Sequence, residues 1–152
     1  MRLGIISDTH GLLRPEAIRA LRGVDLILHA GDVGDAQILT QLKTIAPVFA
    51  VRGNVDTGPW AQELPATAIV EADGASLYVL HNLRHLDLKP GAAGVHAVVS
   101  GHTHQPEQYE RGGVLYLNPG SAGPQRFQLP VTLAILDVAR KPLRAEILPL
   151  LK

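Results

Sequence analysis

Cysteine is absent from this chain of 152 residues, which excludes disulfide bonds and thiolate ligands for a metal. Long apolar runs are also missing, because none approaches the roughly 18–20 residues that a membrane span requires. The segment Met1–Asp8 lacks the extended apolar region of a signal peptide. We therefore expect a cytoplasmic protein that has no membrane partner.

Neither sign of charge is in excess, since 14 acidic residues balance 14 basic ones. Proteins that hold nucleic acid non-specifically usually carry a basic excess for phosphate contacts. The balance argues against a dedicated nucleic-acid surface but leaves a small phosphorylated substrate open. With 46% apolar and 18% charged residues, the chain is typical of globular proteins, and its length predicts a single domain over residues 1–152.

Five short apolar runs are each followed closely by residues that can bind a metal. The runs are Leu3–Ile6, Leu26–Ala30, Val48–Val51, Leu77–Leu80 and Ala97–Val99. The residues that follow them, in the same order, are Asp8 and His10, then Asp32, then Asn54, then His81, and finally His102 and His104. Strands of a parallel or mixed sheet end at one common edge, where open α/β proteins build their sites. We therefore expect these seven side chains to converge.

The remaining pattern predicts an α/β fold in which two mixed β-sheets pack as a sandwich with helices on the outer faces. Helices are expected over Glu16–Arg22, after Pro15, and over Ala36–Lys43, capped by Asp35. Their alternation with the first three strands indicates parallel pairing. Further strands are expected at Thr67–Glu71, Gln108–Arg111, Val114–Leu117, Val131–Leu136 and Leu143–Leu148, in three antiparallel pairs, the first with Leu77–Leu80. Any helix within Arg84–His96 is expected to be short, because Pro and Gly recur there.

Each of these motifs has an ordinary reading when it is taken alone. Asp8 could form an Asx turn, Gly-Asp and Gly-Asn are common turn sequences, and His81 could be a packed core histidine. His29, inside a strand, is more readily a core residue than a ligand. Gly101-His102-Thr103-His104 is more specific, since two imidazoles at i and i+2 on a turn can face one site. Taken together, the five motifs favour a metal site because they hold four of the seven histidines.

The order Asp-x-His, Gly-Asp, Gly-Asn, His and Gly-His-x-His resembles that of the calcineurin-like metallophosphoesterases. Ser7-Asp8-Thr9-His10 and Asn118-Pro119-Gly120-Ser121 are similar to elements of the small YfcE-type phosphodiesterases in that family. The resemblance implies that Asp8, His10, Asp32 and His104 hold one metal, while Asp32, Asn54, His81 and His102 hold another. Asp32 would bridge the two ions. It further implies catalytic parts for Asp32, Asn54 and His10.

Imidazole, carboxylate and amide ligands suit manganese, nickel, zinc or iron better than calcium, and we expect two divalent transition metal ions, with manganese first among them. Paired ions can turn a shared water into hydroxide and direct it in line at phosphorus. We therefore predict a phosphodiesterase that acts on a small phosphate ester. The alternative is a non-catalytic interaction scaffold, the use that a retromer subunit makes of this fold. Retention of all seven ligands favours catalysis, and a homo-oligomer remains open.

Two positions depart from the family pattern. Val55 stands where larger phosphatases of the family have a histidine that assists the leaving group, so His10, His85 or water would have to supply that proton. Asn82 follows His81 where glycine is usual and could crowd the second metal. Other polar residues are assigned supporting parts: Asp56 could orient a ligand, Arg52 could meet phosphate, and Asn118 and Ser121 are placed near the metals by the resemblance.

Overall fold

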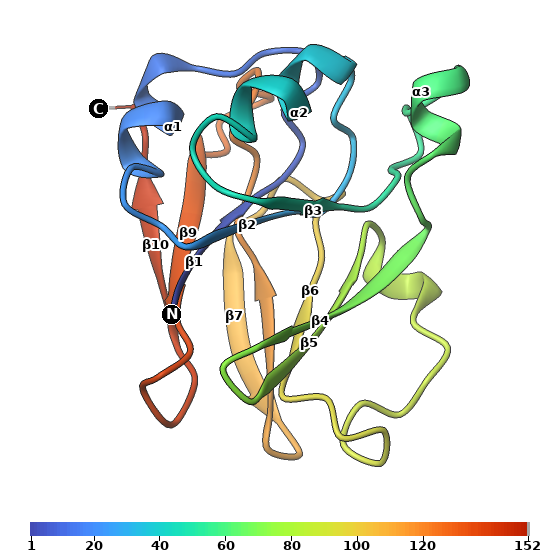
Figure 1. Cartoon of the computed structure of the whole chain (residues 1–152), viewed down its shortest axis with the longest axis vertical. Helices are drawn as coiled ribbons and strands as arrows, with labels where there is room; N and C mark the ends of the chain where they lie inside the picture. Colours follow the sequence, from blue (N-terminus) through green and yellow to red (C-terminus); the bar gives the residue numbers. More distant parts are fainter. Residues whose placement is uncertain (152) are drawn as a thin grey trace.

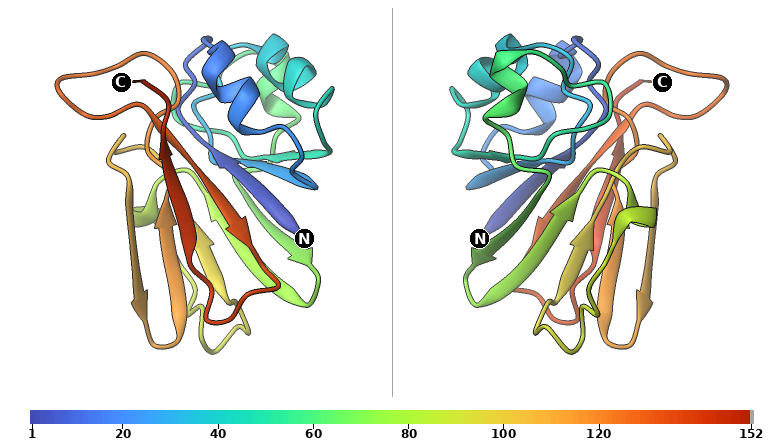
Figure 2. Two further views of the ribbon diagram at one scale, coloured as in Figure 1. Left: turned by 90° about the vertical axis from the view of Figure 1, so that its left-hand side faces the viewer. Right: turned by 90° about the vertical axis from the view of Figure 1, so that its right-hand side faces the viewer.

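The computed structural model describes residues 1–151, which form two five-stranded sheets packed face to face (Figures 1 and 2). The first sheet has the order β10 (Ala145–Pro149), β9 (Thr132–Asp137), β1 (Arg2–Ile6), β2 (Leu26–His29) and β3 (Val48–Ala50). The second has the order β4 (Thr67–Ala72), β5 (Ala75–Leu80), β6 (Ala97–Val99), β8 (Val114–Asn118) and β7 (Glu107–Arg111). The predicted sandwich of two mixed sheets is confirmed.

Each sheet has three neighbouring parallel strands, with antiparallel strands on one side of them in the first sheet and on both sides in the second. Strands β1, β2 and β3 run parallel in the first sheet, as β5, β6 and β8 do in the second. Strand β9 pairs antiparallel with both β1 and β10, while β4 and β7 close the second sheet as hairpin partners of β5 and β8. The parallel strands therefore deliver the loops after β1, β2 and β3 of the first sheet and those after β5 and β6 of the second to one edge of the sandwich.

The main core fills the space between the two sheets. Leu3, Ile5 and Leu28 from the first sheet and Leu77, Val99 and Leu117 from the second belong to this core, and none is more than 1% exposed. Burying a large aliphatic side chain contributes about 1.5–3 kcal/mol, so this apolar contact is what keeps the two layers together. The strand ends that carry the polar motifs are thereby held in fixed relation to each other.

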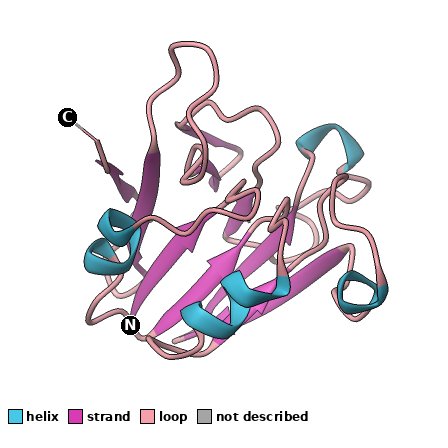
Figure 3. Ribbon diagram, turned by 90° about the horizontal axis from the view of Figure 1, so that it is seen from above, coloured by secondary structure: helices cyan, strands magenta, loops and turns pink. Residues whose placement is uncertain are grey.

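The outer face of the first sheet is covered by α1 (Pro15–Ala20) and α2 (Ala36–Leu42), which lie above the strands in Figure 1 and in front of them in Figure 3. Both predicted helices are confirmed, although α1 ends earlier than expected. The Asp35 carboxylate caps α2 by accepting from the backbone N–H of Gln37 at 2.9 Å. No helix within residues 1–151 is long and apolar enough to cross a membrane.

Within residues 1–151, the second sheet has no comparable helical cover. The 3₁₀ turn η1 (Leu83–His85) and the loop after it pack on its outer face, through Leu83, Leu86 and Leu88. The expectation of helices on both outer faces therefore holds for the first sheet alone. A further short helix, α3 (Pro59–Gln62), was not expected. Its Trp60, and Leu64 just after it, pack against the helix-side core of the first sheet.

Candidate metal centre

The seven predicted ligands come together at the edge where the parallel strands of both sheets end. The first sheet supplies Asp8 and His10 after β1, Asp32 after β2 and Asn54 after β3. The second sheet supplies His81 after β5, and His102 and His104 after β6. Two groups of three side chains each have ligand atoms within 4.8 Å of one another, and each group takes residues from both sheets.

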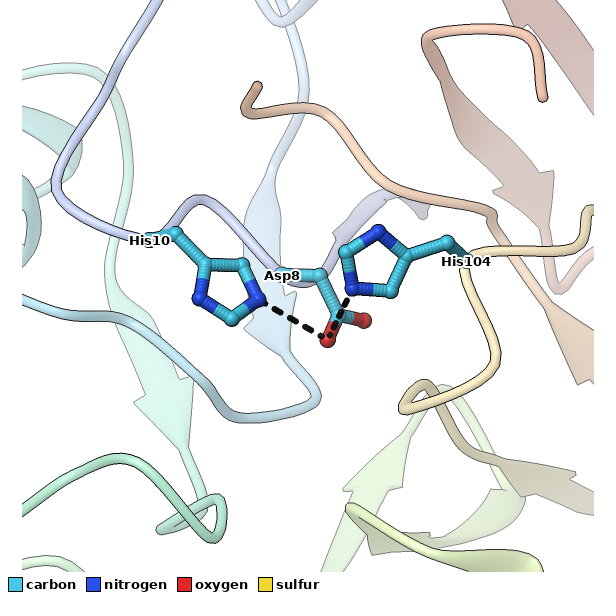
Figure 4. Close-up of side chains that lie close together, drawn as sticks. All are labelled: Asp8, His10 and His104. Atoms are coloured by element: carbon cyan, nitrogen blue, oxygen red, sulfur yellow. Dashed lines mark ion pairs between the residues drawn. The ribbon is translucent and has the colours of Figure 1, made fainter. Parts of the chain in front are cut away.

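Asp8, His10 and His104 form the first group (Figure 4). The Oδ1 atom of Asp8 lies 3.7 Å from Nε2 of His10 and 3.4 Å from Nε2 of His104. The two rings flank the carboxylate and reach the same oxygen atom (Figure 4). One carboxylate oxygen and two ring nitrogens therefore converge at spacings that leave room for an ion between them.

Asp32, His81 and His102 form the second group. The Oδ2 atom of Asp32 lies 3.2 Å from Nε2 of His81. Asn54 joins this group, because its Oδ1 lies 3.2 Å from Nδ1 of His102. Asp32 also reaches the first group, with its Oδ2 3.6 Å from Nε2 of His10. This places Asp32 between the two groups, as a bridging ligand would be.

Four buried polar atoms of this cluster have no hydrogen-bond partner within the described chain: Asp8 Oδ1, His10 Nε2, His81 Nε2 and His104 Nδ1. Buried polar atoms are nearly always bonded in folded proteins, so the three that face one another, Asp8 Oδ1, His10 Nε2 and His81 Nε2, call for a further group. The Nδ1 atom of His81 lies 2.7 Å from the carbonyl of Ala30. That carbonyl can only accept, so Nδ1 donates and Nε2 presents its lone pair to the cluster. The donor set fits divalent transition metal ions.

The backbone adopts the left-handed conformation at five of the seven residues, with φ of 56° at Asp8, 46° at His10, 54° at Asp32, 75° at His102 and 63° at His104. Such residues are uncommon outside glycine and cost about 1–3 kcal/mol each. Neighbouring backbone bonds hold them, for example Asp8 N–H to the carbonyl of Gly31 at 3.0 Å and His10 N–H to that of Asp32 at 2.9 Å. Strain is thus concentrated in this cluster.

The two carboxylates are ionised in spite of their burial. Burial by itself would raise the pKa of Asp8, but the nearby imidazoles of His10 and His104 and the hydrogen bond from the Ser7 hydroxyl outweigh it and lower the pKa. The pKa of Asp32 is likewise lowered, because the nearby imidazole of His81 and the hydrogen bond from the backbone N–H of Val55 outweigh burial. In the ion-free protein the same two carboxylates raise the pKa of His81 against the effect of its burial. The cluster therefore attracts positive charge.

The residues predicted to support the ligands contact the loops rather than the cluster's open side. The Asp56 carboxylate accepts from the backbone N–H groups of Val33, Gly34 and Gly53 at 3.1, 2.9 and 2.9 Å, which ties the loops after β2 and β3 together. Ser121 donates from Oγ to the carbonyl of Asp8 at 3.0 Å. Both contacts fix the backbone from which a ligand projects.

Asn118 and Arg52 also bond to backbone. The amide of Asn118 donates to the carbonyl of Gly101 at 3.0 Å and accepts from the N–H of Gly120 at 2.9 Å. The guanidinium of Arg52 donates to the carbonyl of Leu64 at 2.9 Å. Arg52 nevertheless lines a cavity of about 250 Å³ together with Asn54, His81, Asn82, His85 and His102. Its predicted contact with phosphate stays a prediction.

His29 and Thr9 form a buried link that the motif order did not reveal. The Nδ1 atom of His29 accepts from the N–H of Gly31 at 3.1 Å, and its Nε2 lies 3.0 Å from Oγ1 of Thr9. That hydroxyl donates to the carbonyl of Val33 at 2.9 Å, so His29 must donate to it. Burial lowers the pKa of His29 to about 4 and keeps it neutral. His29 is the core residue that its place in a strand suggested.

A profile described as the calcineurin-like phosphoesterase superfamily domain matches residues 1–141. The chain belongs to this superfamily. A probable metallophosphoesterase from Methanothermobacter thermautotrophicus is 39% identical, over 97% of this chain and 92% of the relative. The phosphodiesterase YfcE from Escherichia coli K12 is 29% identical, over 90% of this chain and 88% of its own. The resemblance drawn from the motifs is therefore confirmed.

Solved structures agree on the fold. A structure described as that of an archaeal phosphodiesterase superposes with a TM-score of 0.81 at 26% identity, over 97% of this chain and all of the other. The zinc complex of Vps29 from Entamoeba histolytica superposes with a TM-score of 0.75 at 21% identity, over 99% of this chain and all of the other. The second likeness concerns architecture alone.

Proposed function

We propose that the protein is a metal-dependent phosphodiesterase that cleaves a small phosphate ester by the action of two divalent metal ions. The observation that carries the proposal is the double cluster, in which two groups of ligand atoms meet at Asp32 and leave three buried atoms that face one another without hydrogen-bond partners. A structural ion pair would need no such surplus of unpaired atoms. Membership of a phosphoesterase superfamily supports the same conclusion.

In this proposal the ligands divide as their positions suggest. Asp8, His10, Asp32 and His104 would hold one ion, and Asp32, Asn54, His81 and His102 the other. Manganese is expected, with nickel, zinc and iron as alternatives for such a mixed donor set. Bound there, paired ions would supply an activated water for in-line attack on phosphorus and neutralise charge on the phosphate oxygens.

The chain's own residues keep the ligands in place and leave one side open. Asp8 and His104 are buried, whereas His102 and Asn54 are exposed at the mouth. Substrate would therefore approach from the side of His102. Val55 cannot donate a proton, and the Nε2 atom of His10 lies among the carboxylates. His85, exposed and lining the cavity that holds Asn54 and His81, is the better placed donor to a leaving group.

The test is hydrolysis of a chromogenic phosphodiester and its monoester by metal-stripped protein, with manganese, nickel, zinc or magnesium added back. We expect diester turnover to return with a transition metal and to be almost abolished in Asp32→Asn and His102→Ala. Asp87→Asn, which neutralises an exposed carboxylate outside the cluster, is the matched control. Wild-type turnover in either ligand variant would contradict the two-metal proposal.

The alternative function is an interaction scaffold, which the architectural likeness to Vps29 keeps in view. Two metal ions bound per chain without turnover of any phosphate ester would favour it over the enzyme. A cytoplasmic location and a homo-oligomeric state remain predictions, and size-exclusion chromatography with light scattering would test the second.

A further inference from the structure

A larger cavity adjoins the metal centre on the side of the second sheet. Its volume is about 610 Å³, within the range of about 300–1,000 Å³ that ligand pockets occupy. His102 and Thr103 contribute to its lining after β6, Asn82 and Arg84 after β5, and the two strands β7 and β8 also line it. His102 and Asn82 belong as well to the smaller cavity of about 250 Å³. Two cavities of unequal size therefore meet at one predicted metal ligand.

This arrangement suits a phosphodiester with two different arms. A diester carries two organic groups on one phosphorus, whereas a monoester carries one. With the phosphate at the metal centre, each cavity can receive one arm, and the difference in volume favours one large arm and one small arm. In such a substrate, the organic group that fits the larger cavity would determine the specificity of the enzyme.

The chemistry of the larger cavity favours a flat aromatic group. Tyr109 and Tyr116 stand opposite each other on β7 and β8, with ring centroids 5.1 Å apart and planes 4° apart. The guanidinium of Arg111 lies 5.6 Å from the ring centroid of Tyr109. Tyr109 therefore contacts both Arg111 and Tyr116. Tyr116 packs in part against the cluster that includes Val98 on β6, and the part of its ring that lines the cavity is the surface for stacking.

Polar side chains accompany these rings in the lining: Asn82, Arg84 and Glu107 offer donors and acceptors. A purely aliphatic arm offers these groups no partner, whereas a nucleobase combines a flat ring with a polar edge that can bond to them. The balanced charge of the chain, with 14 acidic and 14 basic residues, argues against a basic surface dedicated to a polymer of nucleotides. The chemistry thus fits a single nucleoside.

We propose that the larger cavity binds the nucleoside arm of a phosphodiester substrate, with its base stacked on Tyr116. This proposal rests on the phosphodiesterase function proposed above. Stacking of a base on an aromatic side chain is worth about tenfold or more in binding. Loss of this stacking contact should therefore reduce the preference of the enzyme for nucleoside esters. The reduction should be the same whichever metal is used.

The experiment compares two esters that share one leaving group, thymidine 5′-(4-nitrophenyl phosphate) and methyl 4-nitrophenyl phosphate. In the manganese-loaded wild type we expect kcat/KM to be about tenfold or more higher for the thymidine ester. Tyr116→Leu, which keeps an apolar side chain, should reduce this ratio about tenfold, while Tyr116→Phe should retain it. Glu110→Ala is the matched control, on β7 outside the cavity lining, and thermal unfolding verifies that each variant folds.

The outcomes separate the two proposals. Equal kcat/KM for both esters in the wild type would overturn the nucleoside site and leave the phosphodiesterase intact, as would an unchanged ratio in Tyr116→Leu. Turnover of neither ester would overturn the phosphodiesterase. Calorimetric titration with thymidine 5′-monophosphate would then test nucleoside binding in the larger cavity. Weaker binding in Tyr116→Leu than in the wild type would support the nucleoside site, and no binding to the wild type would overturn it as well.

Discussion

The buried imidazole of His29 predicts a loss of stability in mild acid that can be measured apart from the metal centre. His29 is fully buried, and both its ring nitrogens are engaged in hydrogen bonds that require the neutral ring. The perturbation is a decrease in pH from 7 to 4 in the ion-free protein. His29→Gln, which can still donate to Thr9, provides the comparison because its side chain does not titrate.

The magnitude follows from the pKa values of the folded and unfolded states. Burial lowers the pKa of His29 from 6.5 to about 4. As the pH falls, His29 is therefore protonated near pH 6.5 in the unfolded chain but only near pH 4 in the folded chain. Between these values the unfolded state holds more protons, and stability falls as pH falls. A difference of about 2.5 pKa units at about 1.36 kcal/mol per unit amounts to about 3 kcal/mol.

Urea unfolding of both proteins with chelator present, at half-unit steps between pH 7.5 and 4, provides the assay. We expect the free energy of unfolding of the wild type, minus that of His29→Gln, to fall by about 3 kcal/mol across this window. Taking the difference removes the titrations that both proteins share, including those of the carboxylate cluster. A difference that stays constant with pH would refute the reasoning, as would an imidazole proton resonance of His29 that titrates near pH 6.5.

Three further predictions concern the site and its supports. Replacing the buried carboxylate in Asp56→Ala leaves three backbone N–H groups without their acceptor and should lower the free energy of unfolding by about 3 kcal/mol, measured by urea titration; a loss below about 1 kcal/mol would contradict this. His85→Ala should slow hydrolysis of a diester with an alkoxide leaving group about tenfold or more and spare one with 4-nitrophenolate; equal effects on both would exclude proton donation. Metal at about 100 times its dissociation constant should stabilise the stripped protein by about 2.7 kcal/mol, and calorimetry of Asp32→Asn should show most of this gain lost.

The strands and the residues of the candidate centre were predictable because they depend on local patterns. Short apolar runs mark buried strands, and the edge where parallel strands end is fixed by topology, so Asp32 and His81 could be expected near each other although they are far apart in sequence. The position of β8 beside β6, by contrast, depends on how the second sheet assembles. No local signal in the sequence specifies that neighbour.

The left-handed backbone at the ligand positions was not predictable. His102 and His104 show an ordinary turn sequence, and their φ values of 75° and 63° depend on contacts with distant strands. One such contact is the bond from the N–H of His102 to Oδ2 of Asp8 at 3.1 Å. The outer face of the second sheet was misjudged for a related reason, since Leu83, Leu86 and Leu88 cover it without helical periodicity.

Each of the two ligand groups contains residues from both sheets, so the centre lies at the junction between the two halves of the molecule. The loops after β1 and β2 deliver Asp8 and Asp32, and the loops after β5 and β6 deliver His81 and His104. An ion bound there would link the two sheets at the end opposite the β4–β5, β7–β8 and β9–β10 hairpin turns. Assembly of the binding site would then require both sheets to be folded and packed together. Metal affinity would therefore report on the packing of core residues far from the ligands.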